Sequence, residues 1–172
     1  NFESLERRRL LAYVTWDNGG DGASWSDPLN WSENVVPQTG DSVFISSASH
    51  EVVLTEDVSL GGLVVYSAGL TVDSATVTCE DGVAIDWGHI YIKNGSVLHS
   101  SGETITVDGG LSIGRPGDTV PSRLVLDGAF NDFNGEGGIG FNAGSVLDLT
   151  GVNVPRGSVS HRFFISGAII EA

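Results

Sequence analysis

The sequence is poor in the residues that build helices and covalent cross-links. It contains no methionine and only one lysine, and its single cysteine, Cys79, excludes a disulfide bond within the chain. No apolar run approaches the roughly 20 residues that a membrane-spanning helix needs. The sequence therefore predicts neither a disulfide-stapled scaffold nor a transmembrane segment.

Basic residues are also scarce. The 172 residues include 8 basic and 22 acidic side chains, which gives a formal net charge of −14. Proteins that bind nucleic acid need positive charge to neutralise phosphates, so we expect no nucleic-acid partner. A strongly acidic surface keeps a protein soluble and collects divalent cations only weakly.

Glycine and β-branched residues dominate what remains. The 24 glycines are about twice the usual share of roughly 7%. Val, Ile, Thr and Ser carry most of the other positions, and these residues favour extended strands. From Asp41 onward, short runs alternate apolar and polar residues and are separated by turns of Gly, Asn and Asp. This pattern predicts one all-β domain.

The short runs recur at an interval typical of stacked coils. Four of them open with glycine and carry two apolar residues two positions apart, namely Leu63/Val65, Ile90/Ile92, Leu111/Ile113 and Ile139/Phe141. The first members of these pairs are 27, 21 and 28 residues apart. We therefore predict a single-domain parallel β-helix, or β-solenoid. A β-sandwich or jelly roll is the alternative, because it also uses many short strands. A bulged loop at 130–134 would explain the 28-residue interval.

The sequence predicts three consecutive segments. Residues 1–15 form an N-terminal export-like arm, because they join a basic cluster to a short apolar run. Residues 16–172 form the solenoid, with an N-terminal aromatic cap and the first strand at 16–45 and the coils at 46–172.

Two motifs resemble those of known exported proteins. FESLERRRLLA resembles the FE-x-LE-x-RR-x-LLA motif at the N-terminus of large exported proteins of planctomycete-type bacteria. The segment W-x-x-GG-x-G-x-x-W-x-x-x-x-NW-x-x-x-x-VP-x-x-x-D-x-V-x-I, from Trp16 to Ile45, is similar to the opening of β-helical repeat domains in bacterial surface and autotransporter- or adhesin-like proteins. The resemblance implies an extracellular or cell-surface protein with a solenoid fold. It carries no catalytic residue over to this chain.

The tryptophans of the cap are the first candidate site. Trp16, Trp25 and Trp31 lie within sixteen positions of one another, among turn-forming residues. Flat aromatic rings can stack on sugar rings, so these residues are candidates for carbohydrate binding. The alternative is that they pack together as a core that covers the first coil.

Acidic residues of the cap are a second candidate site. Asp17, Asn18, Asp21 and Asp27 supply oxygen atoms of the kind that calcium prefers. Pro28 stands where a calcium loop of the helix-loop-helix type would need a glutamate. The alternative is that these side chains cap turns. Calcium is the one cofactor that the sequence suggests.

The sequence gives little support for an enzyme. GEGGIG at 135–140 matches the dinucleotide pattern G-x-G-x-x-G, but strand and turn residues follow it instead of a helix. The four histidines have no metal-ligand spacing, and no nucleophile motif occurs. Carboxylates at strand ends could still meet across coils, as in lyases and glycosidases, with basic residues beside them. The carboxylates are Asp73, Asp86, Asp108, Asp127 and Asp148, and the basic residues are Lys93, Arg115 and Arg123.

The last strand-like run is apolar. Phe163, Phe164, Ile165, Ile169 and Ile170 are expected to pair with another copy of the chain or with further coils of a longer one. Head-to-tail pairing that does not close gives a filament. We therefore expect a non-enzymatic, extracellular structural or adhesive protein. The alternative is a carbohydrate-binding or polysaccharide-lyase-like module that acts on a surface polysaccharide.

Overall fold

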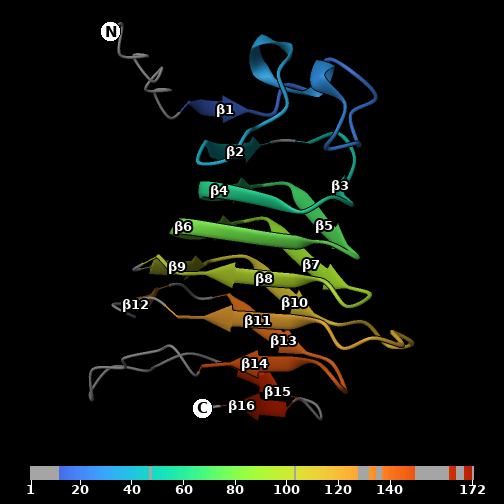
Figure 1. The fold of residues 1–172 in the computed structure, drawn as a ribbon, viewed down its shortest axis with the longest axis vertical. Coiled ribbons are helices and arrows are strands. Elements are labelled where there is room, and N and C mark those ends of the chain that lie inside the picture. The colour runs from blue at the N-terminus through green and yellow to red at the C-terminus, as the bar shows by residue number, and fades with distance from the viewer. Residues whose placement is uncertain are drawn as a thin grey trace, which may run out of the picture.

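The chain folds as a parallel β-helix (Figure 1). The structure is a computed structural model that describes residues 12–46, 48–102, 104–127, 132–134, 137–149, 163–165 and 169–171. All hydrogen-bonded pairs of the named strands are parallel, which confirms the predicted solenoid and rules out the antiparallel sandwich. Among the described residues, no helix is long and apolar enough to cross a membrane.

Two sheets run along the length of the molecule. The 6-stranded sheet contains β3 (Val52–Leu54), β5 (Gly69–Asp73), β7 (His89–Lys93), β10 (Gly110–Ile113), β13 (Gly138–Phe141) and β15 (Phe163–Ile165). The 10-stranded sheet contains β1 (Tyr13–Thr15), β2 (Ser42–Ser46), β4 (Val58–Tyr66), β6 (Thr76–Asp86), β8 (Val97–Ser100), β9 (Thr104–Val107), β11 (Arg123–Leu126), β12 (Asp132–Asn134), β14 (Val146–Asp148) and β16 (Ile169–Glu171).

The 10-stranded sheet divides into two faces. The first part of β6 pairs with β8, and its last part pairs with β9. The register between β4 and β6 shifts between Leu60 and Gly62, where the two strands turn from one face to the other. A β-bulge bends a strand in this way. Each coil from β4 to β13 therefore presents three runs of strand residues, two in this sheet and one in the other.

Apolar side chains stack in columns inside the coils. In the 6-stranded sheet, Leu70, Ile90, Leu111 and Ile139 are register partners from one coil to the next. Each of these side chains is buried. Along each strand, the residue that follows points to the outer face of the sheet. This alternation is the period of two that the sequence displays, because neighbouring side chains of a strand point to opposite faces.

The first apolar pair of the predicted repeat, Leu63/Val65, lies in a different sheet from the other three. Ile90, Leu111 and Ile139 do stack, but Leu63 pairs with Val83 in the other sheet. The partner of Ile90 in the preceding coil is Leu70, only 20 positions earlier. Each coil carries apolar pairs on more than one face, so spacing alone does not show which face a pair belongs to.

Glycine opens several of these runs because the coils approach closely at the corners. A Cβ atom on Gly109 would lie 2.1 Å from the carbonyl oxygen of Gly88. A Cβ atom on Gly137 would in turn lie 2.1 Å from the carbonyl oxygen of Gly109. Three successive coils therefore pack backbone against backbone at this corner, and no larger residue fits there.

The 28-residue interval between Leu111 and Ile139 has a different origin from the predicted one. Val77 pairs with Leu98 after 21 residues, whereas Leu98 pairs with Leu124 after 26. Most of the added length therefore lies before Leu124, in the loop 114–122. Residues Asp132–Asn134, predicted as part of a bulged loop, instead form β12 in register with β9. Residues 130 and 131 lie outside the described part of the chain.

The boundary of the N-terminal arm also needs correction. Tyr13–Thr15, predicted to belong to the export-like arm, forms β1 and pairs in register with β2. Val14 is buried in the core, so burial of alternate side chains extends the solenoid to these residues. Residues 1–11 lie outside the described part.

The predicted C-terminal strand region does form strands. Phe163, Phe164 and Ile165 lie in β15, which pairs with β13. Ile169 and Ile170 lie in β16, which pairs with β14. Ile169 is exposed, and the side chains of the other four residues lie outside the description.

Candidate functional site

The three tryptophans of the N-terminal cap form a buried cluster. The rings of Trp16 and Trp25 meet that of Trp31 edge to face, with centroids 4.8 and 4.7 Å apart. Trp31 is fully buried, and its Nε1 donates to the carbonyl oxygen of Trp25 at 2.6 Å. All three rings are at most 4% exposed. They leave no ring face for a sugar, so the predicted platform is wrong for these residues and their packing matches the core alternative.

Asn30 and Asp21 hold the backbone of the cap together. The buried Asn30 side chain accepts hydrogen bonds from the amides of Gly20 and Gly22 through its oxygen. Its Nδ2 donates to Asp21, which also accepts the hydroxyl and amide of Ser24. The Ser24 hydroxyl, the Ser24 amide and further hydrogen bonds hold the pKa of Asp21 well below its ordinary value of 3.8.

The predicted calcium ligands are occupied as turn caps. Asp17 accepts the amide of Gly19, and Asp27 accepts the amides of Leu29 and Asp21. Among the described residues, no group of three or more His, Cys, Asp or Glu side chains is arranged to hold a metal ion. The geometry of the cap thus matches the turn-capping alternative and does not support a calcium site.

Asn18 ties the cap to the coils below it. Its side-chain oxygen accepts a hydrogen bond from Nε1 of Trp16 at 2.9 Å and from the amide of Ser49 at 3.2 Å. The Ser49 hydroxyl also contacts Nδ1 of His50 at 3.2 Å. The loop that carries Ser49 and His50 is one wall of an open groove, so the cap positions part of that groove.

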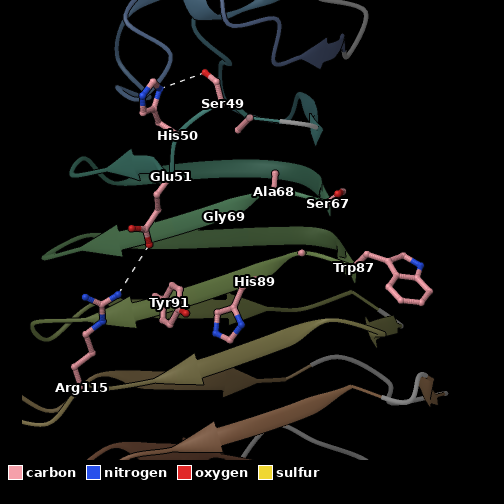
Figure 2. A pocket seen from close by; sticks show the side chains of 12 residues that line it. Ser49, His50, Glu51, Ser67, Ala68, Gly69, Trp87, His89, Tyr91 and Arg115 are labelled. Atoms are coloured by element: carbon pink, nitrogen blue, oxygen red, sulfur yellow. Dashed lines mark hydrogen bonds and ion pairs between the residues drawn. The ribbon is translucent and has the colours of Figure 1, made fainter.

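The groove runs across the outer face of the 6-stranded sheet (Figure 2). It has a volume of about 620 Å³ and is lined by the loop 48–51, the turns 67–69 and 87–89, and the side chains of Tyr91 and Arg115. Ligand sites are commonly concave surfaces of this size with a few placed polar groups. Within the part of the chain that the structure describes, this groove is the best candidate for a binding site.

A stack of three side chains forms the centre of the groove. The rings of His89 and Tyr91 are stacked with centroids 4.0 Å apart, and the guanidinium carbon of Arg115 lies 4.6 Å from the Tyr91 centroid. His89 and Tyr91 point outward from β7 because Ile90 and Ile92 point into the core. Arg115 arrives from the start of the loop 114–122. The stack holds the guanidinium in place by a cation–π contact.

His89 lies flat because the neighbouring strand has glycine beside it. A Cβ atom on Gly110 would stand 2.1 Å from Nδ1 of His89, so only glycine leaves room for the ring. The Nε2 atom of His89 reaches the hydroxyl of Ser112 at 3.0 Å. Partial burial lowers the pKa of His89, and the nearby Arg115 lowers it further, although Glu51 opposes both effects. The imidazole is therefore mostly neutral at pH 7.

Glu51 faces Arg115 across the groove. Its Oε1 lies 4.0 Å from Nη2 of Arg115, and both side chains are roughly two-fifths exposed, at 43% and 41%. Glu51 also accepts a hydrogen bond from the hydroxyl of Thr71. The pair therefore places hydrogen-bond acceptors and donors side by side at the surface, as Figure 2 shows.

Trp87 stands at the rim of the groove and is 79% exposed. It has a left-handed backbone with φ of 54°, and its ring projects outward away from the His89–Tyr91 stack (Figure 2). Tyr66, also partly exposed, forms an isolated backbone bridge with Trp87. A large aromatic ring that the fold leaves in solvent is more informative than one in the core.

The sequence contained a signal for this groove. In HIYIK, the inward isoleucines place His89 and Tyr91 outward, and Trp87 falls in a turn between Asp86 and Gly88 instead of in an alternating run. No pattern in the sequence indicates that Glu51 and Arg115 lie close together. They meet because of the stacking of coils and the length of the loop before β11.

The strand-end carboxylates do not assemble into a catalytic pair in the groove. Asp73 pairs with Lys93 at 3.0 Å, Asp127 with His99 at 2.8 Å, and Asp148 with Arg123 at 3.1 Å. Glu51 is the one carboxylate that lines the groove in the described part of the chain. Of the predicted basic residues, Arg115 alone reaches the groove, and Cys79 is buried with its pKa raised to about 12 by desolvation.

No family model matches the chain, and neither does any curated protein or solved structure.

Proposed function

We propose that the chain is a non-enzymatic, exported surface protein that adheres to polysaccharide through the groove on its 6-stranded sheet. The observation that carries the proposal is a groove with the exposed ring of Trp87 at one end and the Glu51–Arg115 pair at the other (Figure 2). Tryptophan offers a flat apolar face to a sugar ring, while paired donors and acceptors suit its hydroxyls. The resemblance of both N-terminal motifs to exported surface proteins supports the location.

The open shape of the groove suits a polymer better than a small metabolite. Small-molecule sites enclose most of their ligand, whereas this groove lies open on the face of a sheet. The coils repeat along the axis of the solenoid, so an extended chain can follow their surface. Binding does not need a cofactor in this proposal, and the groove is proposed to hold its ligand without cleaving it.

A glycan-array measurement with purified protein tests the proposal. Wild type is expected to bind at least one polysaccharide, and Trp87→Ala is expected to weaken that binding about tenfold or more without lowering the melting temperature. Tyr13→Ala is the matched control, because Tyr13 is an exposed aromatic, at 63%, on a different face. Equal loss in both variants, or no binding to any glycan, would count against the groove.

The same samples test the absence of catalysis. We expect no new reducing ends and no absorbance from unsaturated uronates after prolonged incubation with the bound polysaccharide. Steady release of either product would replace adhesion with a lyase or glycosidase activity.

End-to-end assembly is a second candidate function. β15 and β16 are the last strands along their sheets among the described residues, and Ile169 on β16 is 54% exposed. Strand edges of this kind pair readily with another chain. Light scattering before and after deletion of 163–172 tests this, with a smaller particle expected after deletion. An unchanged monomer before and after deletion would remove the idea.

A further inference from the structure

The charges inside the groove cancel one another. Glu51 and Arg115 face each other with opposite charge, and the lowered pKa of His89 leaves its ring mostly neutral at pH 7. The chain as a whole is acidic, with 22 acidic against 8 basic side chains. A polyanion approaching the groove therefore meets a repulsive field that no net positive charge in the groove offsets.

The Glu51–Arg115 pair is the loosest of the ion pairs that the structure describes for lysine and arginine. Its separation of 4.0 Å exceeds the 3.0 and 3.1 Å of the pairs formed by Lys93 and Arg123. Each partner has a second anchor, which is the Tyr91 ring for the guanidinium and the Thr71 hydroxyl for the carboxylate. The two groups are therefore held in place and still have hydrogen-bonding capacity toward solvent.

Neighbouring hydroxyls of a sugar ring match this arrangement. A hydroxyl both donates and accepts hydrogen bonds, whereas a carboxylate accepts only and a guanidinium donates only. One hydroxyl can donate to Glu51 while the next accepts from Arg115, and neither charged group then loses its partner. A sugar carboxylate in the same position would lie against Glu51, where like charges repel.

We infer that the groove binds uncharged polysaccharide and discriminates against uronate polymers. Glu51 and Arg115 form hydrogen bonds with two adjacent sugar hydroxyls. This inference rests on the proposed function and adds the chemical class of the ligand. It also assigns Glu51 a direct role, since its carboxylate accepts a sugar hydroxyl.

A matched pair of polymers tests the inference. Polygalacturonate and its fully methyl-esterified form share one backbone and differ in charge, and they are assayed by affinity electrophoresis beside an array of neutral and acidic polysaccharides. Wild type is expected to bind uncharged polymers at least tenfold more tightly than charged ones. Equal or tighter binding of the acidic polymers would overturn the inference while leaving polysaccharide adhesion intact. Failure to bind any polymer would remove the proposed function as well.

The variant Glu51→Gln separates the two ways in which the pair could work. If Glu51 accepts a sugar hydroxyl, Glu51→Gln weakens binding of the uncharged polymer about tenfold and gives no gain for polygalacturonate. If Arg115 instead serves a sugar carboxylate, removing Glu51's charge releases the guanidinium and strengthens binding of polygalacturonate, which would overturn the inference. Asp73→Asn is the control, because it neutralises a carboxylate of another ion pair outside the groove. An unchanged melting temperature confirms that each variant is folded.

Discussion

The cap and the groove both contain clustered aromatic side chains, yet the fold treats them in opposite ways. In the cap, three tryptophans pack edge to face and are excluded from water. At the groove, Trp87 is left in solvent at one end, and Glu51 and Arg115 form a loose ion pair at the other. Aromatic residues alone therefore do not mark a sugar site. Exposure and the neighbouring hydrogen-bonding groups decide what each cluster can do.

The difference follows from what each region must satisfy. The cap covers the first coil, so its rings bury apolar surface and its polar side chains pair with backbone groups. The groove lies on a face that the solenoid already supports from inside, so its outward side chains are not needed for the core. The two regions meet at Asn18, which accepts from both Trp16 and Ser49.

Replacing a cap tryptophan should have the largest effect on stability. Trp31→Ala removes a fully buried ring that contacts both other cap tryptophans, and such changes cost about 3–5 kcal/mol. Denaturant unfolding measures the loss, and Trp87→Ala, expected within about 0.5 kcal/mol of wild type, is the comparison. A loss below about 1 kcal/mol for Trp31→Ala would mean that the cap is not part of the core.

Neutralising Asp21 should have an intermediate effect that depends on pH. Its folded pKa lies below 3.8, so the stability that it contributes is present above pH 3.8 and declines as pH falls through the folded pKa. Asp21→Asn should therefore have a lower melting temperature than wild type by a constant amount from pH 5 to 8. The difference should narrow below about pH 3.8.

Glu56→Gln, which removes an exposed carboxylate elsewhere, is the control for the general loss of charge. A difference between Asp21→Asn and wild type that is absent at pH 7, or that grows toward acid pH, would contradict this role for Asp21.

A glycine change beneath the groove should have the smallest effect on stability and a clear effect on binding. In Gly110→Ala the new methyl displaces the His89 ring from its place against Tyr91. Loss of that aromatic contact costs about 0.5–1.5 kcal/mol, and the β-strand gain of alanine over glycine offsets about 0.5–1 kcal/mol of it. Calorimetry should show a net change below about 1 kcal/mol, with polysaccharide affinity reduced several-fold.

The matched control for that change is Gly140→Ala. Gly140 lies two residues along β13 from the register partner of Gly110, and its nearest neighbours are 3.9 Å or more from an added Cβ. It should leave both stability and affinity close to wild type. Comparable losses of affinity in the two variants would show that polysaccharide binding does not depend on the position of the His89 ring.

The fold could be predicted from the sequence because a coil repeats one local pattern. Alternation assigns inward and outward residues within a strand, as in HIYIK, and glycine marks the corners where backbones touch. The phase of the repeat could not be predicted, since Leu63 and Leu70 both begin apolar pairs but belong to different faces. Only the pairing of strands separates them.

The groove was harder to predict than the fold. Glu51, His89 and Arg115 come from three coils, and their meeting depends on the lengths of the intervening turns. The sequence pattern does not mark the loop 114–122, which sets the position of Arg115, as the main insertion. The cap tryptophans are conspicuous in the sequence because three lie close together, whereas Trp87 differs from them in its position in a turn.

Quenching of tryptophan fluorescence by iodide tests the central contrast most directly. We predict that Trp87 supplies nearly all of the emission that iodide can quench, that Trp87→Phe removes this fraction, and that bound polysaccharide protects it in wild type. The cap tryptophans should contribute to quenching only after unfolding. Equal access of iodide to all four tryptophans, or a polysaccharide that binds without protecting Trp87, would contradict the account.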